Sequence, residues 1–290
     1  MNELNLGIIG KGFVGTAVSR GFNDGGSKNF PPVRQWVVDP KLGQESHSIG
    51  ELCFQQVDLA FVCVPTPSYD KLREVDPTYI KTVLHDLRKH TFEGLVVIKS
   101  TITPDYLKEM VDHFADLRIV YNPEFLTERT AERDFKNPFF HVIGGDWDDC
   151  CYLESVYKKY SQCAPAPVFK TDVVTASLVK YALNTHYATK VVFMNEMYQL
   201  HEASGAETTW DEFREILAAD PRLGPSHLMV PGPDGQYGFG GNCFPKDTNA
   251  LLHYAFTLGV KMGVLETAVN RNVNIRKLIE ENQIPFKLVV

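Results

Sequence analysis

Residues 4–22 read LNLGIIGKGFVGTAVSRGF, and this stretch restricts the fold more than any other part of the chain. A short apolar run leads directly into Gly10, Gly12 and Gly15, and a helical pattern follows. Glycines spaced G-x-G-x-x-G between a strand and a helix let backbone amides and the helix N-terminus approach a pyrophosphate. The stretch therefore predicts the first strand, turn and helix of a dinucleotide-binding sheet.

The next strand-like run ends at Asp39, 24 residues after Gly15. A carboxylate at that position can accept hydrogen bonds from both ribose hydroxyls and would repel a 2′-phosphate, so the sequence favours NAD over NADP. Phe13 and Val14, inside the glycine motif, complete the predicted cofactor-binding turn. A purely structural tight turn is the alternative interpretation of these glycines.

Strand-like and helical segments alternate through the first part of the chain. Because such alternation is typical of parallel sheets covered by helices, we expect a doubly wound α/β domain. The predicted strands are residues 4–10, 33–39, 58–64, 94–100, 117–121 and 139–145, and helices are predicted at 76–90 and 103–115.

The second part of the chain has a different character, because residues 172–204 contain neither Gly nor Pro. This segment predicts one long helix of roughly 50 Å, whose apolar surface needs cover from other helices or from a second subunit. Residues 208–219 and about 245–282 also have helical patterns, separated by a Pro- and Gly-rich loop at 220–241. We therefore expect a Rossmann-like NAD-binding domain at 1–171, a helical domain at 172–290, and a homodimer formed through the long helix.

Composition excludes several other classes of protein. Lys and Arg total 29 against 36 Asp and Glu, without a basic run, which argues against nucleic acid as a partner. The N-terminus has no basic signal region and the apolar runs are shorter than a membrane span, so we expect a soluble cytoplasmic protein and no membrane partner. Six cysteines without a CxxC pair and nine histidines without HExxH predict no metal site.

Polar residues stand at the predicted carboxyl ends of two strands. Thr66 follows the run 58–64, and Ser100 and Thr101 end and follow the run 94–100. Ligands of open α/β sheets bind at this edge, so these side chains are candidates for contact with cofactor or substrate. Threonine is also common in ordinary turns, which is the alternative.

The segment 122–135, NPEFLTERTAERDF, contains two closely spaced glutamates. Asn122 and Pro123 suit the start of a helical turn, in which Glu124 and Glu128 would share a face. One of two neighbouring carboxylates can be poised as a base. A solvated charged turn is the competing hypothesis.

Lys180 and Asn184 lie four residues apart among apolar neighbours on the predicted long helix. A lysine and an amide on one face of a buried helix need a polar partner, and a charged substrate oxygen would serve. A lysine that extends its ammonium group to solvent is the alternative.

The segment 238–247, GFGGNCFPKD, surrounds Cys243 with glycines and polar residues. Its glycines permit close approach of the backbone and leave the thiol unshielded, while Lys246 and Asp247 can tune a thiolate and its protons. A structural cysteine does not require such surroundings.

Taken in order, several stretches resemble the UDP-glucose/GDP-mannose dehydrogenase family, and within it the UDP-glucose 6-dehydrogenases. The matching stretches are GIIGKGFVG, FVCVPTP, IKST, NPEFLTERTAERDF, LVKYALNTHYATKVVFMNEM and GFGGNCFPKD. The resemblance implies a four-electron oxidation of the C6 alcohol of a nucleotide sugar to a carboxylate, with two NAD and one water. UDP-glucose is the implied substrate and UDP-glucuronate the product.

The resemblance also implies roles for individual residues. Cys243 would capture the aldehyde as a thiohemiacetal that becomes a thioester, with Lys180 and Asn184 stabilising the oxyanion. The remaining implied roles are proton transfer through water for Asp247, activation of the hydrolytic water for Glu124, support of that water for Thr101, and a place near the cofactor for Glu128 and Thr66.

Three departures from the family pattern are visible. Arg129 stands where Gly is usual, Asn242 stands where Ser is usual, and the third domain that the family uses to grip the nucleotide is not in this sequence. Two alternatives therefore stay open: a β-hydroxyacid-type dehydrogenase with a single hydride step, and a non-catalytic NAD-binding or assembly module. The former gives Cys243 no role.

Overall fold

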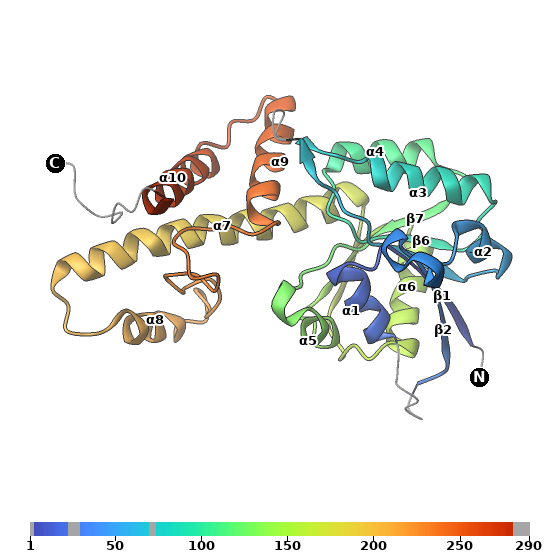
Figure 1. The fold of residues 1–290 in the computed structure, drawn as a ribbon, viewed down its shortest axis with the longest axis horizontal. Coiled ribbons are helices and arrows are strands. Elements are labelled where there is room, and N and C mark those ends of the chain that lie inside the picture. Colours follow the sequence, from blue (N-terminus) through green and yellow to red (C-terminus); the bar gives the residue numbers. More distant parts are fainter. Residues whose placement is uncertain (1–2, 23–29, 70–73, 281–290) are drawn as a thin grey trace. The chain divides into compact units, whose positions relative to one another are not determined.

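The structure, a computed structural model, describes residues 3–22, 30–69 and 74–280 of the chain (Figure 1). The chain forms two compact units. The first unit is built from residues 1–67 and 75–180, and the second from residues 68–74 and 181–290.

One sheet, ordered β2-β1-β3-β6-β7-β8-β9, organises the first unit. Neighbouring strands are parallel except for β7 and β8, which pair antiparallel. The order reverses at β1, between β2 and β3, and the loops that follow strands at such a switch point form the ligand-binding crevice of open α/β sheets. The strands are β1 (Leu4–Ile9), β2 (Val33–Val38), β3 (Leu59–Val62), β6 (Leu95–Ile98), β7 (Arg118–Tyr121), β8 (His141–Gly145) and β9 (Val168–Thr171).

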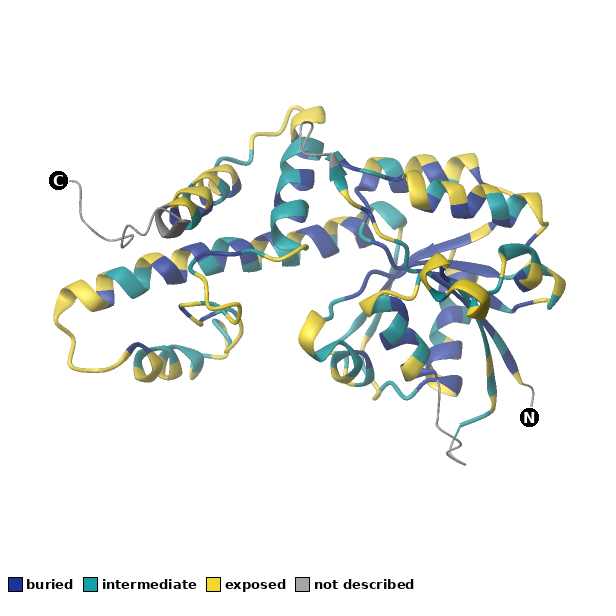
Figure 2. Cartoon of the chain, viewed as in Figure 1, coloured by how far each residue is buried: buried dark blue, intermediate teal, exposed yellow. Residues whose placement is uncertain are grey.

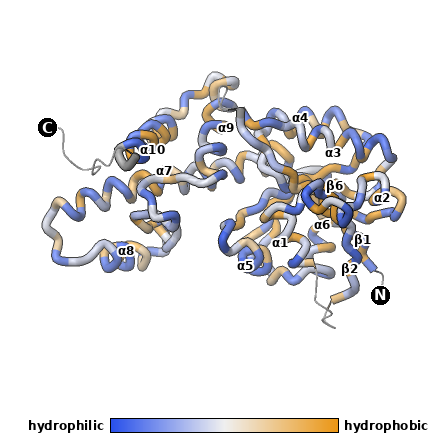
Figure 3. Tube along the Cα trace, in the orientation of Figure 1, coloured by the Kyte–Doolittle hydropathy of each residue, from blue (hydrophilic) through white to orange (hydrophobic). Residues whose placement is uncertain are grey.

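The central strands are almost entirely apolar, as Figure 3 shows, because both of their faces are covered. Residues of β1, β3 and β6 form one core cluster with apolar side chains of the flanking helices. Figure 2 shows the corresponding pattern of burial, with buried strands and helices exposed on their outer faces. This core fixes the strand ends from which the functional loops leave the sheet.

Six α-helices and two 3-10 turns connect the described strands of the first unit. Local capping explains several of their ends: the Asp146 side chain accepts hydrogen bonds from the amides of Asp148 and Asp149 at the start of α6, and Ser48 forms a capping box with Glu51 in α2. The elements are α1 (Phe13–Gly21), η1 (Pro40–Glu45), α2 (Ile49–Phe54), α3 (Thr78–Lys89), α4 (Pro104–His113), η2 (Glu128–Thr130), α5 (Ala131–Lys136) and α6 (Trp147–Tyr160).

The second unit is mainly helical. Its helices are α7 (Val173–Ser204) from Tyr181 onward, α8 (Trp210–Ala218), α9 (Phe244–Thr257) and α10 (Gly263–Glu280). The short strands β4 (Ser68–Tyr69) and β5 (Glu74–Val75) pair with each other, and all of their residues except Val75 belong to this unit. Two apolar clusters support the unit. One packs Ala188 and Val192 of α7 against Ile275 of α10, and the other surrounds Trp210 with Met194 and the loop after α8.

The predicted fold class is confirmed, since a mostly parallel sheet with flanking helices is followed by a helical region with one long helix. Two features of the seven-stranded sheet were not predicted: β9, and the antiparallel pairing of β8. β9 is an edge strand without full burial of either face, so its sequence lacks a clear apolar pattern. The compact units divide between Lys180 and Tyr181, inside α7. The boundary at 171/172 stays a prediction, and residues 281–290 lie outside the described residues.

Candidate active site

Each of the three glycines after β1 is required for a different structural reason. Gly10 has φ +89°, and a Cβ there would lie 2.8 Å from the carbonyl oxygen of Cys63, in the loop after β3. A Cβ on Gly15 would lie 2.0 Å from the carbonyl oxygen of Gly10, so α1 packs directly against the turn. Gly12, which caps α1, has no atom within 4 Å of its Cβ position and therefore leaves open space beside the helix N-terminus. An anion such as a pyrophosphate fits this open position.

Asp39 is buried at the end of β2 and bonded to the glycine turn. One carboxylate oxygen accepts from the amide of Lys11 at 2.6 Å, and the other accepts from the amide of Lys41 at 2.8 Å. A carboxylate has about four acceptor positions, so each oxygen retains capacity for a ribose hydroxyl. The open glycine turn and this carboxylate together fit the pyrophosphate and ribose of NAD.

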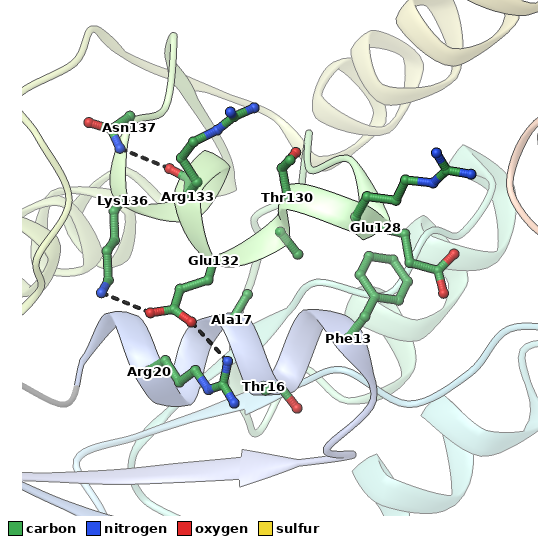
Figure 4. A pocket seen from close by; sticks show the side chains of 12 residues that line it. Phe13, Thr16, Ala17, Arg20, Glu128, Thr130, Glu132, Arg133, Lys136 and Asn137 are labelled. Atoms are coloured by element: carbon green, nitrogen blue, oxygen red, sulfur yellow. Dashed lines mark hydrogen bonds and ion pairs between the residues drawn. The ribbon is translucent and has the colours of Figure 1, made fainter. Parts of the chain in front are cut away.

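A pocket of about 700 Å³ in the first unit is lined by α1 and by the segment 128–137 (Figure 4). It brings together two residues predicted to contact the cofactor, Phe13 and Glu128, while Val14 is half-buried in the first turn of α1. In its wall Glu132 accepts hydrogen bonds from Arg20 at 2.9 Å and Lys136 at 3.0 Å, which hold the pKa of Glu132 below its ordinary value.

The polar residues after β3 and β6 differ in burial and in hydrogen bonding. The Ser100 hydroxyl donates to the carbonyl oxygen of Val64 at 2.6 Å and so ties the two strand-end loops together. Thr66 is buried and Thr101 is half-buried in these loops. The Ser100 hydroxyl hydrogen is therefore used within the protein, which makes Thr66 and Thr101 the stronger candidates for ligand contact.

Glu124 and Lys180 form a buried ion pair in the first unit, with only 7% and 3% of the side chains exposed. The lysine ammonium donates to Glu124 Oε1 at 2.9 Å and also to the backbone oxygen of Glu124 at 2.6 Å. Glu124 Oε2 accepts from the amide of Leu126 at 2.7 Å. Both charges are thus held in fixed orientations by hydrogen bonds.

This geometry corrects the predicted helical turn at 122–128. Residues 122–127 are not helical, so Glu124 and Glu128 do not share a helical face; Glu124 is buried and Glu128 is exposed. Asn122 does not cap a helix, because its side chain is buried and donates to the carbonyl oxygen of Val142 at 2.7 Å. The polar partner of Lys180 is a protein carboxylate, a possibility that residue spacing alone did not suggest.

Cys243 ends a glycine loop in the second unit and directly precedes α9. The side-chain amide of Asn272, on α10, bonds both backbone groups of Phe239, accepting from its N–H at 2.7 Å and donating to its carbonyl at 2.9 Å. The amide of Gly238 donates to Asn195 of α7 at 3.0 Å. A Cβ on Gly238 would lie 2.4 Å from the Asn272 oxygen, so this glycine allows the close approach. The loop is therefore fixed from α7 and α10.

Asp247 lies one turn into α9 and is 1% exposed. Its Oδ2 accepts from the Asn184 side chain at 2.6 Å, and its Oδ1 accepts from Lys246 at 2.6 Å. The second unit thus gathers Cys243, Asn184, Lys246 and Asp247 near the start of α9. The first unit gathers Glu124 and Lys180.

The sequence interpretation missed several supporting residues. Asn195 and Asn272 hold the cysteine loop, and Lys99 holds Asn122. A charged residue near the end of the apolar run GLVVIKS was the visible signal for Lys99, whereas single asparagines within helices carry no comparable signal.

The described residues include neither a metal-binding cluster nor a membrane-spanning helix. No group of three or more His, Cys, Asp or Glu side chains in residues 3–22, 30–69 and 74–280 is placed to hold a metal ion. In the same part of the chain, every helix is too short or too polar to span a bilayer.

A doubly wound sheet with an open glycine turn and a following helical unit that carries a loop cysteine defines an NAD-binding protein of the dehydrogenase type. Residues 43–161 match the NAD binding domain of the UDP-glucose/GDP-mannose dehydrogenase family, and residues 174–274 match its central domain. The chain belongs to this family, and its cofactor is NAD.

Individual relatives carry names of different substrates. GDP-mannose 6-dehydrogenase of Pseudomonas aeruginosa is 32% identical over 93% of this chain and 69% of its own length. UDP-glucose 6-dehydrogenase of Rickettsia typhi is 30% identical over 93% of this chain and 67% of its own length. A solved UDP-glucose dehydrogenase from Pyrobaculum islandicum superimposes with a TM-score of 0.76 at 27% identity, over 97% of this chain and 72% of that one. For the GDP-mannose 6-dehydrogenases of Pseudomonas savastanoi and Pseudomonas syringae the chain spans only 58% of the relative's length.

Proposed function

We propose that this chain is an NAD-dependent nucleotide-sugar dehydrogenase that oxidises the sugar C6 alcohol to a carboxylate. The proposal includes a covalent thioester on Cys243 and two hydride transfers for each sugar. UDP-glucose is the proposed substrate and UDP-glucuronate the product.

The arrangement around Cys243 carries the proposal. The cysteine follows a loop fixed by Asn195 and Asn272, and it directly precedes the N-terminus of α9. Negative charge is favoured at a helix N-terminus, which suits a thiolate nucleophile. A fully buried carboxylate, Asp247, lies one turn further on. A single-hydride dehydrogenase has no use for a nucleophile held in this way.

NAD supplies the hydride acceptor, and the residues of the chain manage protons and charge. In the first oxidation the alcohol loses a hydride and a proton. Asp247 receives the proton through a water molecule. The Cys243 thiolate then adds to the aldehyde carbon and forms a thiohemiacetal oxyanion. Asn184, oriented by its 2.6 Å hydrogen bond to Asp247, donates to this oxygen together with Lys180.

Loss of the second hydride converts the thiohemiacetal into a thioester. Glu124 takes a proton from the attacking water, and Thr101 supports that water. Hydrolysis then breaks the carbon–sulfur bond, releases the carboxylate and returns the Cys243 thiol. Lys180 fixes the orientation of the glutamate through two hydrogen bonds, to its carboxylate and its backbone oxygen. Oriented acids and bases of this kind commonly contribute about 10²–10⁴-fold to rate.

The stoichiometry of NADH tests the proposal. Purified protein with excess NAD is given UDP-glucose, GDP-mannose or a UDP-N-acetylhexosamine in parallel, and NADH is measured per sugar consumed. Two NADH per UDP-glucose support the proposal, and two per another sugar keep the chemistry but correct the substrate. One NADH per substrate indicates single-hydride chemistry, and no NADH with NAD still bound indicates a non-catalytic module. Cys243→Ala, which should bind NAD normally and form no acid, is the control.

We also propose that two copies of the chain associate through α7. Phe193 and Leu200, seven residues apart and therefore on one helical face, are 54% and 60% exposed. Apolar side chains aligned on a long helix are typical of a subunit interface. Analytical ultracentrifugation should find a dimer for the wild type and a monomer for Phe193→Glu; a monomeric wild type would refute this.

A further inference from the structure

One buried lysine has no part in the mechanism above. Lys99 directly follows β6, and only 3% of it is exposed. Strand alternation places its side chain on the same face as Leu95 and Val97, which belong to the core cluster. A charge in such a place is costly unless it is well bonded. Its bonds therefore indicate why the lysine is there.

The bonds of Lys99 converge on one residue. Its ammonium donates to the backbone oxygen of Asn122 at 3.0 Å and to the side-chain oxygen of Asn122 at 3.0 Å. A third, longer bond of 3.5 Å reaches the hydroxyl of Tyr157, which itself donates to the Asn122 side chain at 2.7 Å. Three donor hydrogens of the ammonium thus have three neutral oxygen partners.

Asn122 is completely buried and anchored on every side. Its amide donates to the carbonyl oxygen of Ile98 at 2.9 Å, and its side-chain NH₂ donates to the carbonyl oxygen of Val142 at 2.7 Å. With the bonds from Lys99 and Tyr157, the residue is fixed between β6, β8 and α6. Asn122 is therefore a rigid start for the segment that follows it.

That segment leads to Glu124 after one residue, Pro123, whose ring fixes the backbone angle φ. Lys180 holds the other end, at the carboxylate and backbone oxygen of Glu124. The three residues 122–124 are therefore clamped by two buried lysines that bond the chain in the same manner, through one side-chain oxygen and one backbone oxygen each.

We propose that Lys99 is a positioning residue that fixes the carboxylate of Glu124 through Asn122. The inference rests on the proposed role of Glu124 as the base for thioester hydrolysis. A catalytic group must be held to within about 0.5 Å of its productive position, and residues 122–127 have no regular secondary structure to do so. Lys99 supplies that constraint.

The electrostatic surroundings of Lys99 are consistent with a lysine that holds Asn122 by hydrogen bonds. Burial, together with a smaller effect of the Lys180 charge, lowers the pKa of Lys99 to about 8 against the opposing effects of Cys63, Glu124 and Cys163. Burial raises the pKa of Tyr157 and lowers the pKa of His141, the other titratable groups beside it, so it favours the neutral form of both side chains. Lys99 thus remains an ammonium donor at pH 7 among mostly uncharged neighbours.

Hydrogen exchange followed by mass spectrometry tests the positioning directly in the full chain. Lys99→Met keeps an unbranched, largely apolar side chain that is one atom shorter and removes its donors. We expect faster exchange in peptides that cover residues 122–128, where the Leu126 amide is bonded to Glu124. Leu84→Ala, a substitution in the buried face of α3 that does not touch this network, is the control for a general loss of stability and should leave that segment unchanged.

Kinetics give the second measurement. A displacement of about 1 Å in a reacting group can cost about 10²-fold in rate, so we expect kcat to fall by about that factor in Lys99→Met. The KM for NAD should stay within about twofold, because the glycine turn and Asp39 are unaffected. Leu84→Ala should keep the wild-type kcat at temperatures at which it is folded.

Wild-type exchange at 122–128 together with a wild-type kcat in Lys99→Met would overturn the inference. If that variant does not fold, Asn122→Ser removes the acceptor while leaving the lysine, and the same local loss is expected; unchanged exchange there also overturns it. If the wild type makes no NADH from any nucleotide sugar, the proposed function fails, and the exchange comparison still decides whether Lys99 holds the segment.

Discussion

The buried pair of Lys180 and Glu124 permits a quantitative prediction about stability. Replacing Lys180 by Met removes both hydrogen bonds and leaves a carboxylate that is 7% exposed without its counter-charge. Breaking a buried pair from one side typically costs about 3–5 kcal/mol. Since a backbone oxygen also loses its donor, we expect a value near the upper end, about 4–5 kcal/mol.

A double-mutant cycle separates the pair from the loss of packing. Glu124→Gln in the Lys180→Met background removes the remaining charge, so the double variant should be more stable than the sum of the single effects predicts. The coupling energy should be about 2–3 kcal/mol. The matched control is Lys81→Met, in the exposed pair with Glu109, which should cost less than about 1 kcal/mol.

Tryptophan fluorescence during urea unfolding measures these values for the correct unit. Two of the three tryptophans, Trp36 and Trp147, lie in the first unit, and Trp210 lies in the second. A Trp210→Phe background therefore reports the first unit alone. Additive single effects, or a cost below about 1 kcal/mol for Lys180→Met, would refute the reasoning, because either result means that the pair is screened by solvent.

Four further predictions follow from the geometry. Gly12→Ala should keep the melting temperature but weaken NAD binding measured by fluorescence quenching, whereas Gly15→Ala should lower the melting temperature; equal effects in both assays would contradict the assigned roles. Asn272→Ala leaves two backbone groups of Phe239 unbonded and should destabilise the second unit by about 1–3 kcal/mol for each of them. Trp210 fluorescence measures this loss, and a total effect below about 1 kcal/mol would contradict the idea that Asn272 anchors the cysteine loop. Burial lowers the pKa of His141 from 6.5 to about 4, so between these pH values the unfolded chain binds a proton that the folded chain does not. The free energy of unfolding should therefore fall by about 3 kcal/mol as the pH drops from 6.5 to 4, and it should level off below pH 4. H141F should flatten this part of a plot of urea midpoint against pH. Iodoacetamide should label Cys243 and abolish turnover, with nucleotide sugar protecting the thiol; full activity after stoichiometric labelling would exclude the thioester.

The candidate residues that could be named from the sequence are those that depend on local pattern. Gly10, Gly12 and Gly15 have the spacing that a strand–turn–helix requires, and Cys243 stands out because its own neighbours are unusual. The fold class followed from the alternation of segments. Each of these signals lies within about twenty residues of chain, where period and turn chemistry are informative.

Contacts between distant segments could not be predicted in the same way. Glu124 meets Lys180 across 56 residues, and Asn272 meets the cysteine loop across 33. Nothing in the neighbourhood of either partner specifies the other, so the lysine was assigned a substrate oxygen and the asparagine was assigned no role. The helical turn expected at 122–128 failed for a related reason, since Asn122 bonds to Lys99 and β8, which are remote in sequence, in place of the local amides of a helix cap.

The position of Asp39 has a consequence for protein engineering. The carboxylate expected to select NAD is also the acceptor for the amide of Lys11 within the glycine turn, and for the amide of Lys41 beyond β2. A change to Ala intended to admit NADP would therefore release two backbone donors beside the glycine turn that we expect to bind the dinucleotide. Exchange of cofactor preference needs a replacement such as Ser or Asn, which keeps an acceptor oxygen at residue 39, before a cation for the 2′-phosphate is introduced nearby. In this chain, cofactor preference therefore cannot be changed at Asp39 without also changing the hydrogen bonds that hold the glycine turn.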